Sequence, residues 1–179
     1  MQGPGRELAA GREMVAELCA ELGPEAIEWL LLDGAYIDGA WLAELQQQGI
    51  GAMVRVRADM QIFEQMLQLT RFPEFGFEPY EYLRVIQGHK ELHTVELALI
   101  TDVTLWSSYR QAWQHQDDGG QACPGLSGLP IREERETDSG EAEEIIWGLV
   151  FTRPFSSREA AFECWRSRWD VENQGLREL

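Results

Sequence analysis

The chain has 179 residues, of which 44% are hydrophobic and 26% are charged, with a net charge of −16. This is the composition of a globular domain, and no stretch approaches the ~20 apolar residues that span a bilayer, so we expect no membrane segment and a cytoplasmic location. The acidity argues against a broad basic surface for DNA, and the three widely spaced cysteines predict neither a disulfide framework nor a metal-ligand pair.

The first 60 residues predict helices and strands in alternation. Apolar residues recur at helical or strand spacing, and Gly and Pro separate the segments. We predict helices over 6–22 and 39–48, and strands over 27–32 and 52–57. This order indicates an α/β layer in which the first strand ends at Asp33.

The pattern changes between about residue 60 and residue 144. Residues 82–87 and 93–104 predict strands with no long helix between them, which favours an antiparallel β region. Polar residues dominate 114–144, and the stretch 133–144 holds seven acids and one arginine. We therefore expect a mobile loop over about 114–144.

The end of the sequence predicts a strand over 145–152 and then a helix from about 157. Ser156 and Glu159 stand at the spacing of a capping box at the start of that helix. Farther along, apolar residues spaced by about 100° per residue form one face. These are Phe162, Trp165, Trp169, Leu176 and Leu179.

Two acidic residues are candidates for a functional site, and each has a structural alternative. Glu172 falls in the middle of the apolar face of the last helix, where an acid is costly unless it is paired or binds a metal. It is either a buried functional carboxylate or the partner of Arg168, four residues earlier. Asp33 ends a strand, where ligands of α/β sheets bind, but Asp-Gly is also a common turn pair.

The most specific pattern consists of two segments. The first reads LLLDGAYIDGAWLAELQQQGIGAMVRVRAD, an apolar strand that ends in Asp, followed by a Gly/Tyr turn, a helix and a strand with arginines. The second reads FSSREAAFECWRSRWDVENQGLREL and places Trp165, Arg168, Glu172 and Leu179 at spacings of three, four and seven. Together and in this order they resemble DDE-type transposases of bacterial insertion sequences. That family has Tyr, Arg, Glu and Lys at these spacings, so Leu179 departs from the pattern.

The resemblance implies an α/β fold, namely a partial RNase H-like core with a β-rich insertion. The core would comprise residues 1–59 and 145–179, and the insertion residues 60–144. The activity implied is metal-dependent cleavage and strand transfer of DNA in transposition. Its partners would be the transposon ends, bound by a homodimer on DNA.

The resemblance also implies roles for individual residues. Asp33 and Glu172 would be catalytic ligands of Mg²⁺ or Mn²⁺, which prefer oxygen ligands. Arg168 would orient Glu172 or contact a DNA phosphate. Arg55 and Arg57, which we expect on one face of their strand, would also contact DNA phosphates, although a solvated strand edge explains them equally well.

One feature of the family is missing from the sequence. The first catalytic aspartate should lie on an earlier strand, but residues 1–32 contain no aspartate. We therefore expect a truncated transposase fragment without activity as this chain alone.

Other interpretations remain open. One is a non-catalytic acidic interaction protein or a decayed gene product, which the net charge favours. A phosphatase that uses Asp33 as nucleophile lacks the second aspartate it needs, because Ala35 stands at that position. His89 and His93 are four residues apart, but Lys90 stands where a zinc protease has its glutamate, so we expect a solvated turn or strand start.

Overall fold

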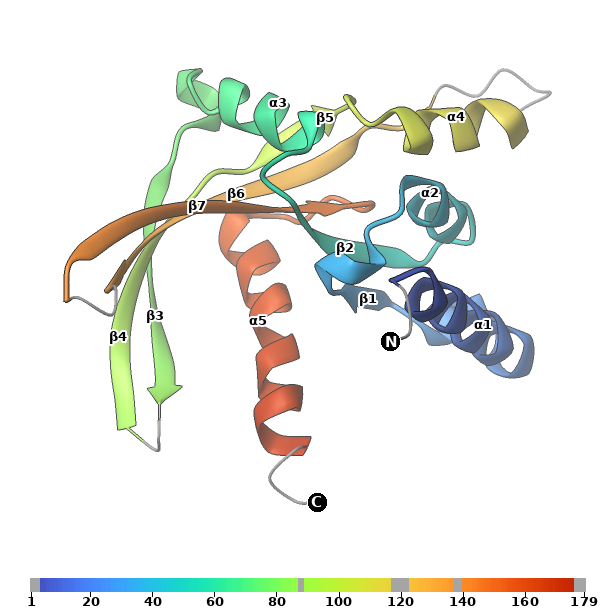
Figure 1. Cartoon of the computed structure of the whole chain (residues 1–179), viewed down its shortest axis with the longest axis horizontal. Helices are drawn as coiled ribbons and strands as arrows, with labels where there is room; N and C mark the ends of the chain where they lie inside the picture. Colours follow the sequence, from blue (N-terminus) through green and yellow to red (C-terminus); the bar gives the residue numbers. More distant parts are fainter. Residues whose placement is uncertain (1–3, 87–88, 117–122, 137–139, 176–179) are drawn as a thin grey trace.

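The computed structural model describes residues 4–86, 89–116, 123–136 and 140–175, and the side chains at the ends of some elements, including residues 169–175, lie outside this description. The chain is a mixed α/β protein with one curled sheet and helices on both of its faces (Figure 1). Its helices are α1 (Pro4–Leu22), α2 (Gly39–Gln47), α3 (Gln61–Leu69), α4 (Ser107–Gln116) and α5 (Arg158–Gly175), with 3-10 turns η1 (Pro24–Ala26), η2 (Gly34–Tyr36) and η3 (Pro73–Phe75). Its strands are β1 (Trp29–Leu32), β2 (Gly51–Val56), β3 (Glu78–Ile86), β4 (His89–Leu97), β5 (Ile100–Val103), β6 (Leu126–Glu136) and β7 (Ala142–Phe151).

The strands follow the order β1-β2-β7-β6-β4-β3, and β5 pairs with β6. Strands β1 and β2 are parallel, with Trp29 opposite Gly51 and Leu32 opposite Val54. The remaining pairs are antiparallel. Helix α2 links the two parallel strands, as a parallel pair requires a crossover.

Two apolar cores lie on the two faces of the sheet. Helices α1 to α4 cover one face, together with Leu32, Val54 and Val150 from the strands. Helix α5 covers the other face, where Phe162 and Trp165 pack on Met53, Leu149 and Phe151. Because β1 contributes side chains to both cores, its sequence is a continuous apolar run.

Two glycines allow helix α3 to lie close to the sheet. A Cβ atom at Gly128 would come within 3.1 Å or less of the Met66 side chain, and one at Gly148 within 3.2 Å of Met66 and Phe63. These positions on β6 and β7 leave room for the buried side chains of α3. Both glycines are therefore explained by close packing.

Several sequence predictions are confirmed, and others are wrong. The expected helices and strands of the first 60 residues, the strand before Pro154 and the last helix are all present. The expected mobile loop over 114–144 is wrong for residues 126–136, which form the central strand β6, for 114–116 at the end of α4 and for 142–144 at the start of β7. Residues 117–122 and 137–139 of that stretch lie outside the described residues. The cap of α5 is Ser157, whose Oγ accepts the Ala160 backbone N–H at 3.2 Å, and not Ser156.

The predicted β-rich insertion shares its sheet with the predicted core. Strands β3 to β6 fall within 60–144, and β6 pairs with β7 from Ser127 opposite Phe151 to Glu136 opposite Ala142. The division of the chain into core and insertion stays a prediction, but the two parts are hydrogen-bonded to each other. Among the described helices, none combines the length and the apolar character needed to cross a bilayer.

The packing of α5 predicts a large effect of Phe162→Ala. Phe162 is 3% exposed, and its removal leaves a cavity between α5 and the sheet. We expect a loss of about 3–5 kcal/mol in the free energy of unfolding, measured with urea, and a smaller loss in Phe162→Leu. The control is Met14→Ala at a site that is 66% exposed, where we expect a change within about 0.5 kcal/mol. Equal effects at the two sites would contradict the packing of α5.

Candidate functional site

Asp33 lies directly after β1, at the end of the parallel pair. One carboxylate oxygen, Oδ1, accepts the backbone N–H of Ala35 at 3.3 Å and so caps the turn η2. The side chain is 64% exposed, and its second oxygen, Oδ2, is directed towards α5. Asp33 therefore fulfils the turn role that its sequence allows and still presents one oxygen to the surroundings.

Arg168 brings helix α5 to that oxygen. Its Nη1 atom lies 3.6 Å from Oδ2 of Asp33, and its guanidinium carbon lies 4.8 Å from the centre of the Trp165 ring. The Arg168 side chain is only 20% exposed, and Trp165 is 3% exposed in the core under α5. The aromatic contact and the low exposure restrict the freedom of the guanidinium.

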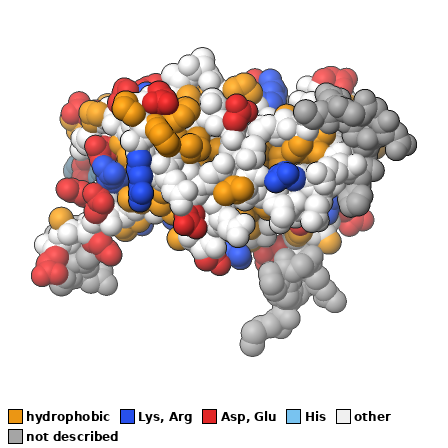
Figure 2. All heavy atoms as spheres, turned by 90° about the horizontal axis from the view of Figure 1, so that it is seen from above, with side chains coloured by type: hydrophobic (Ala, Val, Ile, Leu, Met, Phe, Trp, Pro, Cys, Tyr) orange, Lys and Arg blue, Asp and Glu red, His pale blue; other side chains and the backbone are white. Residues whose placement is uncertain are grey.

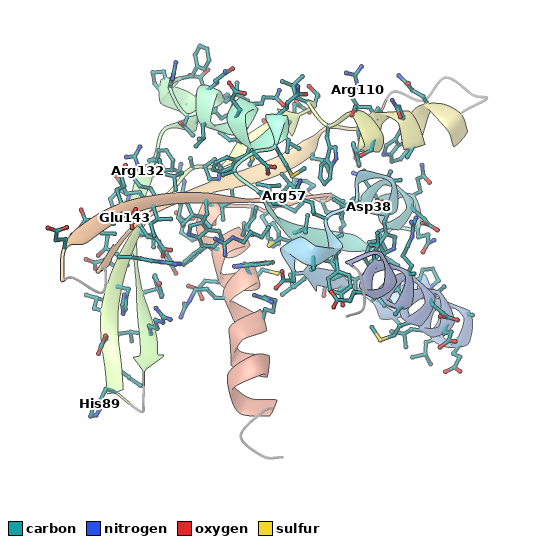
Figure 3. All side chains as sticks on the ribbon, viewed as in Figure 1. Asp38, Arg57, His89, Arg110, Arg132 and Glu143 are labelled. Atoms are coloured by element: carbon teal, nitrogen blue, oxygen red, sulfur yellow. The ribbon has the colours of Figure 1, made fainter. Side chains whose placement is uncertain are left out.

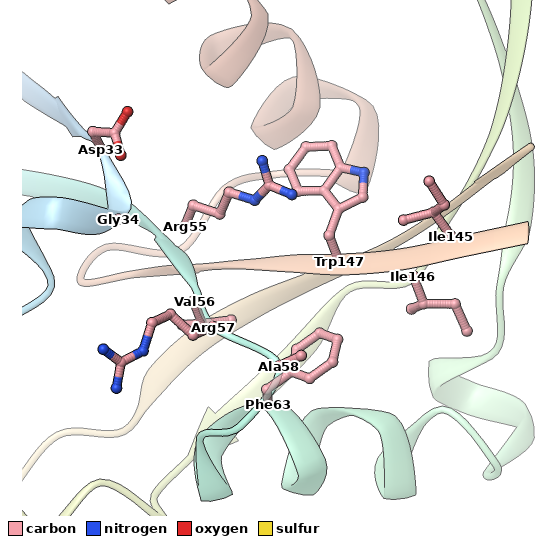
Figure 4. A pocket seen from close by; sticks show the side chains of 10 residues that line it. All are labelled: Asp33, Gly34, Arg55, Val56, Arg57, Ala58, Phe63, Ile145, Ile146 and Trp147. Carbon is pink, nitrogen blue, oxygen red and sulfur yellow. The ribbon is translucent and has the colours of Figure 1, made fainter. Parts of the chain in front are cut away.

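Arg55 and Trp147 lie on the same face of the sheet as Asp33 (Figure 4). The Arg55 guanidinium carbon lies 5.0 Å from the Trp147 ring centre, and Trp147 Nε1 donates to Glu133 at 3.0 Å. Asp33, Arg55 and Trp147 line a hollow of about 310 Å³, together with Gly34, Val56, Arg57, Ala58, Phe63, Ile145 and Ile146. The hollow joins an acid, a guanidinium and an aromatic ring from three neighbouring strands.

Arg57 does not share a face with Arg55, contrary to our expectation. Strand β2 ends at Val56, so Arg57 belongs to the following turn, where it pairs with Asp59 at 3.2 Å. Its side chain points away from that of Arg55 in Figure 4. The alternation of a strand cannot be extended beyond its last hydrogen-bonded residue.

Glu172 lies in α5, but its side chain is outside the described residues. Its position follows Arg168 by four residues, which is about 6 Å along a helix axis. The structure thus brings Asp33 and Arg168 together and leaves the role of Glu172 a prediction.

Trp147 is the part of the site that sequence reasoning missed. In the strand IIWGLVF it alternates with Leu149 and Phe151, so the sequence could predict that these three side chains lie on one face of the sheet. The residues next to it on the adjacent strand could not be predicted, because they depend on how β7 pairs with β2.

The described residues do not by themselves fit a divalent metal ion. Within them, no group of three or more His, Cys, Asp or Glu side chains could hold one. Asp33 faces the guanidinium of Arg168, a cation, where a metal site would have a second carboxylate. A complete metal site here would need the Glu172 side chain and a further acid.

His89 and His93 do not form a metal pair. Both lie on β4, where a separation of four residues corresponds to about 13 Å. His89 lies at the tip of the β3–β4 hairpin (Figure 3), and His93 stacks on Tyr82 with ring centres 5.7 Å apart. Neither histidine lines the hollow that contains Asp33.

Basic side chains are spread over the molecule. Figure 3 shows Arg57, Arg110 and Arg132 on separate elements. Acidic, basic and hydrophobic side chains are mixed on the face over α3 and α4 (Figure 2), which carries no broad basic patch. On this face the described residues therefore offer no extended surface for DNA phosphates, in keeping with the net charge of −16.

Comparison with known proteins does not assign the chain to a family: no family model matches it, and no curated protein resembles it closely enough to count as a relative.

The contact between Asp33 and Arg168 predicts an energetic coupling. In a double-mutant cycle with Asp33→Asn and Arg168→Gln, we expect a coupling of about 0.5–1 kcal/mol in the free energy of unfolding. It should shrink in 1 M NaCl, where the Debye length falls to ~3 Å. Additive effects at low salt would show that the two groups do not interact in solution.

Proposed function

We propose that the chain is part of the catalytic core of a DDE-type transposase with an RNase H-like fold. The observation that carries this proposal is the ion pair between Asp33 and Arg168. These residues belong to the two sequence segments that resemble the family, and they lie far apart in the chain. The ion pair joins the two segments at the end of a parallel strand, which is where ligands bind in α/β sheets.

The arrangement of the elements gives further support. The sheet edge has a parallel pair, β1 and β2, joined through α2, and α5 crosses the face on which Asp33 lies. The segment between β2 and β7 is rich in strands, as expected for the insertion. By this proposal Asp33 and Glu172 are two acidic groups of the site, and Arg55 and Arg168 contact DNA phosphates.

A third carboxylate would have to reach Asp33 from the outer edge of β1. Neighbouring strands are about 4.8 Å apart, so a strand beside β1 could bring an acid to Asp33. Within the described residues, β1 has β2 as its only strand neighbour. Because residues 1–32 contain no aspartate, we propose that the chain alone does not cleave DNA.

A non-catalytic acidic interaction protein is the second candidate. The net charge of −16 and the guanidinium beside Asp33 favour it. The two proposals differ in what they predict for cation binding. A transposase core binds a divalent cation through defined acids, whereas an acidic surface attracts cations diffusely.

Titration with Mn²⁺, followed by calorimetry and by EPR of the free ion, separates these candidates. The transposase proposal predicts one weak site, with Kd of about 1 mM, because the chain supplies fewer acids than a complete site. Asp33→Asn and Glu172→Gln should each abolish that site. The matched control is Asp59→Asn, which removes an exposed acid paired with Arg57 and should leave binding unchanged.

Binding that survives both Asp33→Asn and Glu172→Gln would favour the acidic interaction protein. A parallel assay with a DNA duplex and Mn²⁺ should show no cleavage by the purified chain. Cleavage that depends on Asp33 would contradict the proposal that a further acid is needed.

A further inference from the structure

Strand β1 has a free side at the end of the sheet. The backbone N–H of Gly51 donates to the Glu28 carbonyl at 3.1 Å, and residues along a parallel pair alternate between facing the neighbouring strand and facing away from it. Leu30 therefore presents its backbone groups to β2, whereas the N–H and C=O groups of Trp29 and Leu31 point outwards. Among the described residues, no strand lies beside these outward groups.

The other end of the sheet is covered. There the outermost strand is β3, and its Leu83 carbonyl accepts a hydrogen bond from Nη2 of Arg166 at 2.7 Å. The Arg166 guanidinium carbon also lies 4.2 Å from the centre of the Tyr82 ring. Helix α5 thus supplies a side-chain partner to that edge strand, and the described side chains supply none to the outward groups of β1.

Helix α1 carries an exposed apolar row at the same end of the molecule as β1. Met14, Leu18 and Leu22 are spaced by four residues and are 66%, 40% and 61% exposed. The helix contacts both η1 and η2, the turns that precede and follow β1. It is attached through the buried Val15, and Arg12, on one side of Val15, forms an ion pair with α2 at 2.8 Å.

The apolar row faces away from α2. Met14 and Leu18 lie about 100° and 60° round the helix from Val15, on the side opposite Arg12. Figure 1 shows α4, α2 and α1 in succession, with α1 last. A strand added to β1 would extend the sheet at this end, where the row can cover its apolar side chains.

Acidic side chains surround this surface. Glu7, Glu17 and Glu21 lie within about 60° of the row around α1, and Glu28 and Asp33 stand at the two ends of β1. All five residues are exposed. An occupant of complementary charge has lysine or arginine beside its apolar residues.

A second copy of the chain does not match this surface. In a twofold antiparallel pair of β1 strands, the register that pairs all four residues places Glu28 opposite Asp33. Like charges directly opposite each other destabilise a strand pair, and each copy carries a net charge of −16. The occupant is therefore a different polypeptide.

We infer that the outer edge of β1 and the apolar row of α1 form a docking surface for a β-strand of a partner polypeptide. The strand hydrogen-bonds to the outward groups of Trp29 and Leu31, places apolar side chains against the row and carries Lys or Arg at its ends. The backbone groups require an extended partner, and the row and the glutamates select its side chains. This surface goes beyond the proposed function and does not need Asp33 to be a catalytic residue.

A synthetic peptide that alternates valine with threonine between pairs of lysines tests the surface, with binding followed by fluorescence anisotropy. Leu31→Pro removes the outward N–H of residue 31 without removing a bond to β2. The matched control is Leu31→Ala, which also loses the leucine side chain but keeps the N–H. We expect the peptide to bind about twofold to tenfold more weakly to Leu31→Pro than to Leu31→Ala, the effect of one backbone hydrogen bond.

The apolar row is tested with Leu18→Ser, which should weaken binding about tenfold because the buried leucine contact is lost. Its control is Leu83→Ser, at a leucine on β3 that is 55% exposed, which should leave the affinity unchanged.

A further measurement uses the unmodified chain and so does not depend on the folding of a variant. The bound peptide should slow the hydrogen exchange of the Trp29 and Leu31 amides, measured by NMR. Unchanged exchange of these amides at saturation would overturn the inference.

The remaining outcomes also decide the matter. Equal affinity in Leu31→Pro and Leu31→Ala, or no binding to the unmodified chain at about 1 mM peptide, would overturn the inference. A dimer in sedimentation velocity that is lost in Leu31→Pro but kept in Leu31→Ala would overturn it too, because a second copy would then occupy the edge.

Discussion

The packing of α5 on the sheet decides which polar groups meet at the end of β1. Phe162 and Trp165 anchor the helix on the face formed by Met53, Leu149 and Phe151. From this anchor, the next turn of the helix carries Arg168 to Asp33. If the helix were shifted by one residue, the direction of Arg168 would rotate by about 100° and the ion pair would be lost.

The chemical character of the site follows from this arrangement. Acidic residues give the chain its net charge of −16, but two guanidinium groups, Arg55 and Arg168, lie on the face that carries Asp33. Each rests against a tryptophan ring, which orders the cation without neutralising it. Two cationic groups are therefore gathered on one face of a protein whose overall charge is negative, and their field in solution is short-ranged.

Much of the fold could be predicted from the sequence, because local patterns there agree with the final packing. The run before Asp33 is apolar throughout because β1 lies between two cores, and the spacing of Phe162 and Trp165 marks the buried face of α5. Helix α3 could also have been predicted, since Ile62, Phe63 and Met66 are spaced as on one face of a helix.

Strand β6 could not be recognised from composition. Its first half is buried, but its second half is a charged hairpin arm in which Arg132 pairs with Glu96 and Arg135 with Glu133. The amino-acid composition of this region is therefore that of a polar loop. The site was only partly predictable for a similar reason, because the pairing of Asp33 with Arg168 and of Arg55 with Trp147 depends on contacts distant in sequence.

The most direct test of a shared site formed by Asp33 and Glu172 measures how close residue 172 lies to residue 33. Spin labels would be attached to Asp33→Cys and Glu172→Cys in a chain whose Cys19, Cys123 and Cys164 are replaced by serine, with a 33–89 pair as the distant control. Strong dipolar broadening is expected for the 33–172 pair and none for the control. A 33–172 spectrum equal to the sum of the single-label spectra would contradict the proximity of the two residues.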